Sequence, residues 1–420
     1  MLIVGRAVAG AGASAIFSGG MNIIGFAVPM RTRPIYIAVL SSMFGIAAVV
    51  GPLLGGFLTD KASWRWCFWI NLPLGATAFF AVLIFFKPPP RKVASLTLRQ
   101  KVAEFDILGA ILLICSVVCL LLALQWGGTT YAWQDSKIYG LFIGFGLIIS
   151  LFIYVQFRRG DSATIPPRIL LGQRSIFVGS LFAVLFSMAL YTHMYYLPFY
   201  FQAVKGTTAE GSGIRTIPYL ISVTLFSIVI GGAITVVGSY APFMWAGAAV
   251  FTVGCGMLYT LQVGSGAGKW IGYQIITGIG VGCSVQIPFL ATQVVLTSRD
   301  LPVGSELLFP IPSRSVLTCI DAMVMFFNSL GGAISIPIAQ NLFSNALRTE
   351  LVKYAPGVNP ATVIAAGATH IREVVPLAQL PGTLVAYDGA ITRTFILPIA
   401  TAGLAFVVSG FVSFILHATS

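Results

Sequence analysis

Long apolar runs, separated by short polar segments, recur along the whole chain. Each run is close to the 20 or so residues that an α-helix needs to cross a bilayer, and none shows the short alternating pattern of a membrane β-barrel strand. Eleven membrane-spanning helices are therefore predicted, over residues 2–28, 34–57, 66–86, 105–125, 138–157, 175–201, 214–238, 242–261, 271–296, 321–345 and 391–415. The predicted fold class is an all-α polytopic membrane protein.

Composition and charge agree with this fold class. Hydrophobic residues make up 57% of the 420 residues and charged residues only 9%, and the mean hydropathy is +0.93. Alternate polar segments (29–33, 87–104, 158–174 and 297–320) hold thirteen Lys and Arg residues, whereas the opposite segments hold eight. Basic loops stay in the cytoplasm, so the first set is predicted to be cytosolic. The net charge of +12 thus reflects topology, and no nucleic-acid partner is expected.

The chain shows no pattern that predicts an enzyme, a metal site or a cofactor. The six cysteines are scattered in or beside the predicted spans, and the three histidines form no cluster. An imidazole could titrate near neutral pH, but His193 lies in an apolar run and is expected to be a packed or interfacial residue. Asp106 and Asp321 lie at the entrances of predicted spans and are expected to cap them. No carboxylate is predicted in the middle of the membrane.

Two longer cytosolic segments suggest how the chain is organised. They bracket one pair of spans, so the predicted units are a front helical part over 1–86, a central linker with two spans over 87–174, and a six-helix part over 175–420. A long outer loop is predicted over 346–390. Within it, Asn359 and Pro360 suit the start of a surface helix, because Asn caps helices and Pro is favoured at the first turn.

Two segments near the start combine small residues with unusual side chains. In the first span, Gly5, Gly10 and Gly12 would let a neighbouring helix approach closely, and Arg6 lies in its first turns. A guanidinium there costs several kcal/mol unless it reaches the interface or a polar partner, so Arg6 is either a snorkelling or a functional arginine. In the second span, Pro52 interrupts the helix hydrogen bonds, which lipid tolerates where neighbours satisfy the backbone. Three glycines surround this proline: Gly51, Gly55 and Gly56.

Together these residues resemble the major facilitator superfamily, and within it the fourteen-span drug:proton antiporters. LIVGRAVAGAG is similar to the fourth-span motif of the family, which implies a role in proton coupling for Arg6 and the motif glycine position for Gly10. GPLLGG is similar to the fifth-span antiporter motif, carried here by Gly51, Pro52, Gly55 and Gly56, with Ala47 as a departure. The segments SWRWCFWINLPLG, LALQWGG, YYLPFYFQAVKG, KWIGYQIITGIGVG and FFNSLGGAISIPIAQNLF also resemble the fungal toxin and multidrug efflux pumps.

This resemblance implies a secondary active transporter that works by alternating access. It would export small hydrophobic compounds or mycotoxin-like metabolites in exchange for protons, as a monomer in the lipid bilayer, with a proton gradient and no cofactor. The implied location is the plasma membrane, or a vacuolar or vesicular one. The alternative is an uncoupled, channel-like or lipid-binding membrane protein on the same scaffold. Polar residues of the later spans are candidates for the substrate cavity, although each also suits interhelical hydrogen bonding: Tyr195, Tyr196, Gln202, Gln286, Asn328 and Gln340.

The resemblance also implies that parts of the chain are atypical. Eleven spans instead of fourteen suggest that the first three are missing, in which case the given chain is a remnant that would not transport alone, and a proton-carrying acid would lie in the missing spans. In the fungal family the PVGS turn runs almost directly into MFFNSLGG, whereas here ELLFPIPSRSVLTCID intervenes. Residues near 306–321 are therefore predicted to be a translated intron, which as protein would form a longer cytosolic loop.

Overall fold

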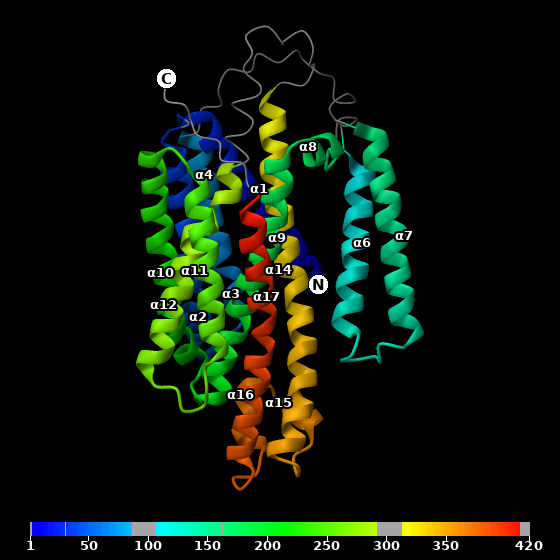
Figure 1. The fold of residues 1–420 in the computed structure, drawn as a ribbon, viewed down its shortest axis with the longest axis vertical. Helices are drawn as coiled ribbons and strands as arrows, with labels where there is room; N and C mark the ends of the chain where they lie inside the picture. The colour runs from blue at the N-terminus through cyan, green and yellow to red at the C-terminus, as the bar shows by residue number, and fades with distance from the viewer. Residues whose placement is uncertain (1, 30, 86–105, 161–162, 292–312, 412–420) are drawn as a thin grey trace.

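The computed structural model describes residues 2–29, 31–85, 106–160, 163–291 and 313–411. These residues form helices and, apart from one isolated bridge between Gly127 and Tyr131, no β-structure. The helices run mostly along the long axis of the molecule (Figure 1). In chain order they are α1 (Leu2–Ala27), α2 (Arg33–Lys61), α3 (Trp66–Trp69), α4 (Asn71–Phe85), α6 (Ile107–Trp126), α7 (Ser136–Arg159), α8 (Pro167–Gly172), α9 (Arg174–Phe199), the π-helix η2 (Tyr200–Val204), α10 (Ala209–Val237), α11 (Ala241–Tyr259), α12 (Ala267–Ser284), α14 (Ser313–Tyr354), α15 (Pro360–Val374), α16 (Leu380–Thr394) and α17 (Ile396–Ser409).

The helices confirm an all-α, multi-pass membrane protein. Within the described ranges, ten segments are long and apolar enough to cross a membrane, and each overlaps a predicted span. Several of these segments join two consecutive helices, as α16 and α17 do over Leu380–Ser409. The remaining predicted span, 34–57, is not among the ten but is helical throughout, as part of α2.

Six spans of the later part pack into one bundle. Helix α9 packs against α14 and α17, α12 lies against both α10 and α11, and α16 continues the contact with α14. Glycines make close approaches possible on α12, because a Cβ on Gly278 would lie 2.5 Å from the carbonyl oxygen of Tyr219 and one on Gly280 would clash with the backbone of Phe251. Lipid offers no hydrophobic driving force between helices, so such close packing has to hold them together.

Helix α10 also connects this bundle to the front part of the chain, through α2. Ile37 and Ala38 on α2 are fully buried. A Cβ placed on Gly231 of α10 would lie 2.5 Å from the Cβ of Ala38 and 3.0 Å from the carbonyl oxygen of Pro34. The two helices therefore meet at a point where only a glycine fits.

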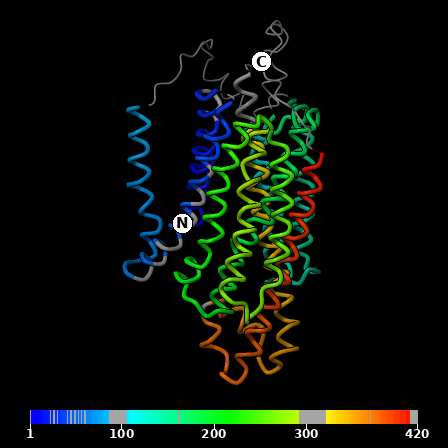
Figure 2. Tube along the Cα trace, turned by 60° about the vertical axis from the view of Figure 1, so that its left-hand side comes forward, coloured from blue at the N-terminus to red at the C-terminus, as the bar shows by residue number. Residues whose placement is uncertain are grey.

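Other helices lie at the periphery. The α6–α7 pair stands to one side of the bundle (Figure 1) and packs mainly against α14, and α4 stands apart from the bundle (Figure 2) with no buried residue. The side chains that these helices expose are largely apolar, for example Phe85 at 80% and Leu147 at 68%. Such faces suit contact with lipid chains.

The predicted cap at Asp106 is confirmed, and its carboxylate does more than cap. It accepts a hydrogen bond from the Gly109 amide (2.8 Å), one from Gln156 Nε2 on α7 (2.8 Å) and one from the Thr164 amide (3.0 Å). Arg159 Nε lies 3.4 Å from Asp106 Oδ1. One carboxylate thus ties the start of α6 to the end of α7 and to the segment that follows.

The structure corrects two predictions about helix ends. Helix α14 begins at Ser313, so Asp321 lies inside the helix and does not cap it. The segment 346–390 is not mainly loop, because α14 continues to Tyr354 and α16 begins at Leu380. An apolar run marks the part of a helix inside the bilayer, and packing between helices can extend the helix beyond that part.

The proposed intron stays a prediction: residues 306–312 fall outside the described residues, and 313–321 are helical.

The surface helix inside this segment is confirmed. Helix α15 starts after Asn359, whose side-chain oxygen accepts a hydrogen bond from the Ala361 amide at 2.9 Å. Its buried face includes Val363 and Ile371. The helix lies at one end of the molecule (Figures 1 and 2), which we call the α15 end.

Segments predicted to share the outer side meet at the α15 end. Lys205 Nζ donates hydrogen bonds to the carbonyl oxygens of Val263 and Ser265, both at 2.7 Å. Arg372 Nη2 donates to the carbonyl oxygen of Val204 at 3.4 Å. The prediction that these three segments share one end of the molecule is therefore confirmed, and the assignment of the α15 end to the outside stays a prediction.

Candidate functional site

Three of the residues predicted to line a substrate cavity lie together between α9 and α14. Tyr196 is fully buried, and its hydroxyl donates a hydrogen bond to Oε1 of Gln340 at 3.0 Å. Tyr195 packs edge-on against the Tyr196 ring, with ring centroids 5.4 Å apart, and is 43% exposed. Phe343 covers the Tyr196 ring from α14. The result is an aromatic cluster with one amide, and of its three rings only that of Tyr195 is exposed for contact with an apolar organic compound.

The other predicted cavity residues lie elsewhere. Gln286 is buried and donates from Nε2 to the carbonyl oxygen of Ser227 on α10, at 2.9 Å. Asn328 precedes Gln340 by twelve residues on α14, which is about 18 Å along a helix axis. Gln202 on η2 donates to the hydroxyl of Ser212 at 3.0 Å. For Gln202 and Gln286, the structure thus provides the interhelical hydrogen bond that was the alternative to substrate contact.

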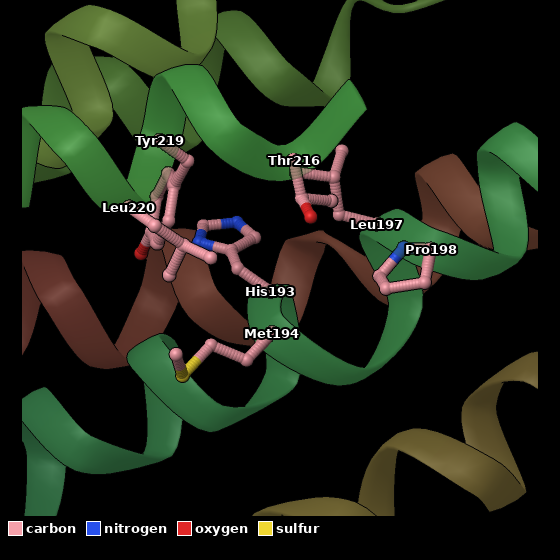
Figure 3. A pocket seen from close by; sticks show the side chains of 7 residues that line it. All are labelled: His193, Met194, Leu197, Pro198, Thr216, Tyr219 and Leu220. Atoms are coloured by element: carbon pink, nitrogen blue, oxygen red, sulfur yellow. The ribbon is translucent and has the colours of Figure 1, made fainter. Parts of the chain in front are cut away.

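A small cavity lies between α9 and α10 (Figure 3), with a volume of about 90 Å³. Helix α9 contributes one face and α10 the other. Most of the lining is apolar, and the polar groups are an imidazole, a phenol and one threonine hydroxyl. The lining residues are His193, Met194, Leu197, Pro198, Thr216, Tyr219 and Leu220.

Two of the lining side chains each have one buried polar atom that lacks a hydrogen-bond partner among the described residues: Nε2 of His193 and the hydroxyl of Tyr219. Both side chains are almost completely buried, at 1% and 2% exposure. The other ring nitrogen of His193 lies 4.0 Å from Cys255 Sγ, and Phe395 packs edge-on against the imidazole at 5.2 Å. A buried polar group without a partner costs free energy, so these two side chains are the polar groups of the lining that a hydrogen-bonding molecule would stabilise.

The position of His193 confirms the prediction of a packed residue, but its neighbours on α10 were missed. Thr216 and Tyr219 are three residues apart, a spacing that places both on one helix face. That spacing was readable in the sequence. What it could not indicate was that this face turns towards His193, because the pairing of α9 with α10 is a matter of tertiary packing.

The residues of the two front motifs lie away from this cavity. Arg6 is exposed, and no atom of another element lies within 4 Å of where a Cβ would sit on Gly10 or Gly12. The neighbour that these glycines are predicted to admit is therefore not among the described residues. Gly51 and Gly55 likewise face open space, and α2 runs through Pro52 without a break. The roles of these residues stay predictions.

Comparisons with known proteins all point to one family. A profile of the Major Facilitator Superfamily matches residues 1–305. The chain is 43% identical over 404 residues to the MFS-type efflux pump MFS1 of Trichophyton rubrum, covering 96% of this chain and 72% of that protein. It is 43% identical over 403 residues to efflux pump roqT of Penicillium rubens, with the same shares. It is 42% identical over 404 residues to the MFS-type transporter astH of Aspergillus oryzae, covering 96% of this chain and 69% of that protein.

Proposed function

The chain belongs to the major facilitator superfamily, and we propose that it is an efflux transporter that exchanges small, mostly apolar organic compounds for protons. The family and the efflux pumps similar to it indicate a transporter and not an enzyme, in agreement with the sequence-based expectation. Export would proceed by alternating access. The relatives named efflux pumps support the direction of transport, and the antiporter-like segments around Arg6 and Pro52 support coupling to protons.

The cavity between α9 and α10 is the observation that carries the substrate class. Ligand sites are mostly apolar, with a few polar groups that fix orientation, and this cavity has that composition. Leu197 and Leu220 offer apolar contact, while His193 and Tyr219 each have one buried polar atom without a hydrogen-bond partner among the described residues. The substrate class that fits is an uncharged, largely apolar compound with a carbonyl or hydroxyl group. Only part of such a compound would enter a cavity of about 90 Å³.

Transport by membrane vesicles tests this proposal. Vesicles are prepared from cells that carry each variant in the chromosomal gene, with a deletion strain as background. Removal of one hydroxyl by Tyr219→Phe should raise the KM for a fluorescent carbonyl compound and leave that of a matched hydrocarbon dye unchanged. Tyr240→Phe is a matched control, because Tyr240 is another buried tyrosine without a hydroxyl partner among the described residues and lies outside the cavity.

Two outcomes would contradict the proposal. Equal KM values for the carbonyl compound in Tyr219→Phe and Tyr240→Phe would remove the cavity from the substrate path. Export that a protonophore leaves unchanged would remove the coupling to protons and favour the uncoupled, channel-like alternative.

A further inference from the structure

A second, larger cavity opens at the α15 end, with a volume of about 560 Å³. Its walls come from α14, α16 and the turn between α11 and α12. In contrast to the cavity beside His193, charged side chains line it: Glu350 and Lys353 from α14, and Asp388 and Arg393 from α16. None of these four belongs to a motif used above.

The two carboxylates of this cavity differ in their partners. Glu350 is 6% exposed and forms an ion pair with Arg393 Nη2. Asp388 is 8% exposed, and its Oδ1 has no hydrogen-bond partner among the described residues. The groups that face Asp388 are the Val263 backbone amide and the ammonium of Lys205. Lys205 Nζ itself donates to two backbone carbonyl oxygens.

A buried carboxylate with an unsatisfied oxygen is costly unless it is neutralised or paired. Two basic groups nearby already have other partners. Arg393 forms an ion pair with Glu350, and Lys205 donates to backbone carbonyl oxygens. Binding of a proton removes the charge without any rearrangement of these contacts. The open cavity gives water, and hence protons, access to the carboxylate from the α15 end.

We propose that Asp388 is the group that takes up the transported proton at the α15 end. The inference rests on the proposed proton exchange and names the acid that takes part in it. The step is simple: the Asp388 carboxylate accepts one proton from water in the cavity and becomes a neutral carboxyl group. Release of that proton on the other side of the membrane would restore the carboxylate.

The position of Lys205 provides a physical link between this proton and the substrate cavity. Lys205 directly follows η2, and η2 continues α9, which carries His193, Met194 and Leu197. A charged Asp388 attracts Lys205, whereas a protonated Asp388 does not. Proton binding therefore changes the force on the end of the helix that lines the substrate cavity.

Other charged and titratable groups surround the site and enter any pH dependence. They are Tyr200 on η2, Tyr259 on α11, Glu350, Lys353 and Tyr354 on α14, Arg393 on α16, and Arg215 on α10, whose charge acts on Lys205. Glu350 is the only other carboxylate in this group, so Glu350→Gln reports whether proton uptake can be assigned to it instead.

Two transport modes separate proton binding from substrate binding. Vesicles with an imposed pH gradient report proton-driven accumulation of a fluorescent apolar substrate. The same vesicles without a gradient report exchange of external for internal substrate. Asp388→Asn should lose gradient-driven accumulation down to the level of the deletion strain and keep exchange at the parental rate. Asp388→Glu, which keeps a titratable acid, should retain accumulation. Asp135→Asn is the matched control, because Asp135 is a half-buried aspartate that caps α7 outside the cavity, and Asn caps equally well.

Each other result counts against the inference. Normal gradient-driven accumulation in Asp388→Asn, or its loss in Glu350→Gln alone, would assign the proton to another group. Loss of both modes in Asp388→Asn at parental abundance would make Asp388 a structural or substrate-binding residue. A parent protein without any dependence on the gradient would overturn the proposed proton exchange as well, and this control measurement distinguishes the two failures.

Discussion

The hydroxyl of Tyr196 on α9 donates a hydrogen bond to Oε1 of Gln340 on α14, at 3.0 Å, across 144 residues of sequence. The bond lies in the contact between these two helices. Phe199 and Phe343 pack against the same tyrosine ring, at centroid distances of 5.6 and 5.7 Å. Since α9 also lines the cavity beside His193, this contact fixes one wall of that cavity relative to α14.

Tyr196→Phe should lower the stability of the folded protein modestly. The change removes one interhelical hydrogen bond, and such bonds contribute about 0.6 kcal/mol on average in membrane proteins. We expect a small decrease in the thermal unfolding temperature of the purified protein in detergent. Tyr195→Phe is the control, because the Tyr195 side chain is 43% exposed. Equal decreases in both variants would show that the hydrogen bond to Gln340 contributes nothing specific.

Acid should destabilise the protein through Asp106. Burial opposes the charged form, but the hydrogen bonds from Gln156, Gly109 and Thr164 outweigh it, and the pKa of Asp106 is lowered from 3.8. The charged carboxylate therefore contributes stability that is fully present above the unfolded-state pKa of about 3.9. This contribution is lost as the pH falls through the lower pKa of the folded state.

The measurement is the unfolding temperature in detergent as a function of pH, for the parent protein and for Asp106→Asn. The parent should be the more stable of the two near pH 6, and the difference should shrink as the pH falls below 4. Two curves that remain parallel over this range would contradict the assignment of this stability to Asp106.

Gly231→Ala should separate α10 from α2. A Cβ at this position meets the Cβ of Ala38 at 2.5 Å, and overpacking of this kind costs about 1–3 kcal/mol. Gly232→Ala next to it is a matched control, because nothing lies within 4 Å of its Cβ. The thermal unfolding temperature should fall clearly for Gly231→Ala and stay at the parental value for Gly232→Ala. Similar values for the two variants would mean that the α2–α10 contact is looser than described.

Arg6→Ala should abolish proton-driven export if Arg6 takes part in coupling, as its resemblance to the fourth-span motif suggests. Arg6→Lys should retain part of the activity, since the charge remains although the planar guanidinium is lost. The assay is gradient-driven accumulation in vesicles from cells with the chromosomal variants. Arg65→Ala is the control, because Arg65 lies outside the fourth-span motif, over the ring of Trp64 at 4.8 Å from its centroid. Parental accumulation in Arg6→Ala would exclude Arg6 from coupling.

Most of the fold could be predicted from the sequence, because a bilayer imposes a local rule. A span needs an apolar run of fixed length, and this requirement does not depend on what the helix packs against. The predicted spans therefore correspond to helices from α1 to α17. The caps at Asp106 and Asn359 were also predictable, since each carboxylate or amide bonds to a backbone amide only two or three residues away.

The sites depended on tertiary structure. The apolar runs end near residue 345 and begin again near 391, so Glu350 and Asp388 read as loop residues, whereas the packing of α14 against α16 extends both helices and buries both carboxylates. In the same way, the facing of His193 to Tyr219 and the bond between Tyr196 and Gln340 arise from helix pairing. Local sequence specifies which residues lie on one face of a helix. Which helix that face meets is determined by close packing between segments far apart in the chain, and this packing decided where the buried polar groups came together.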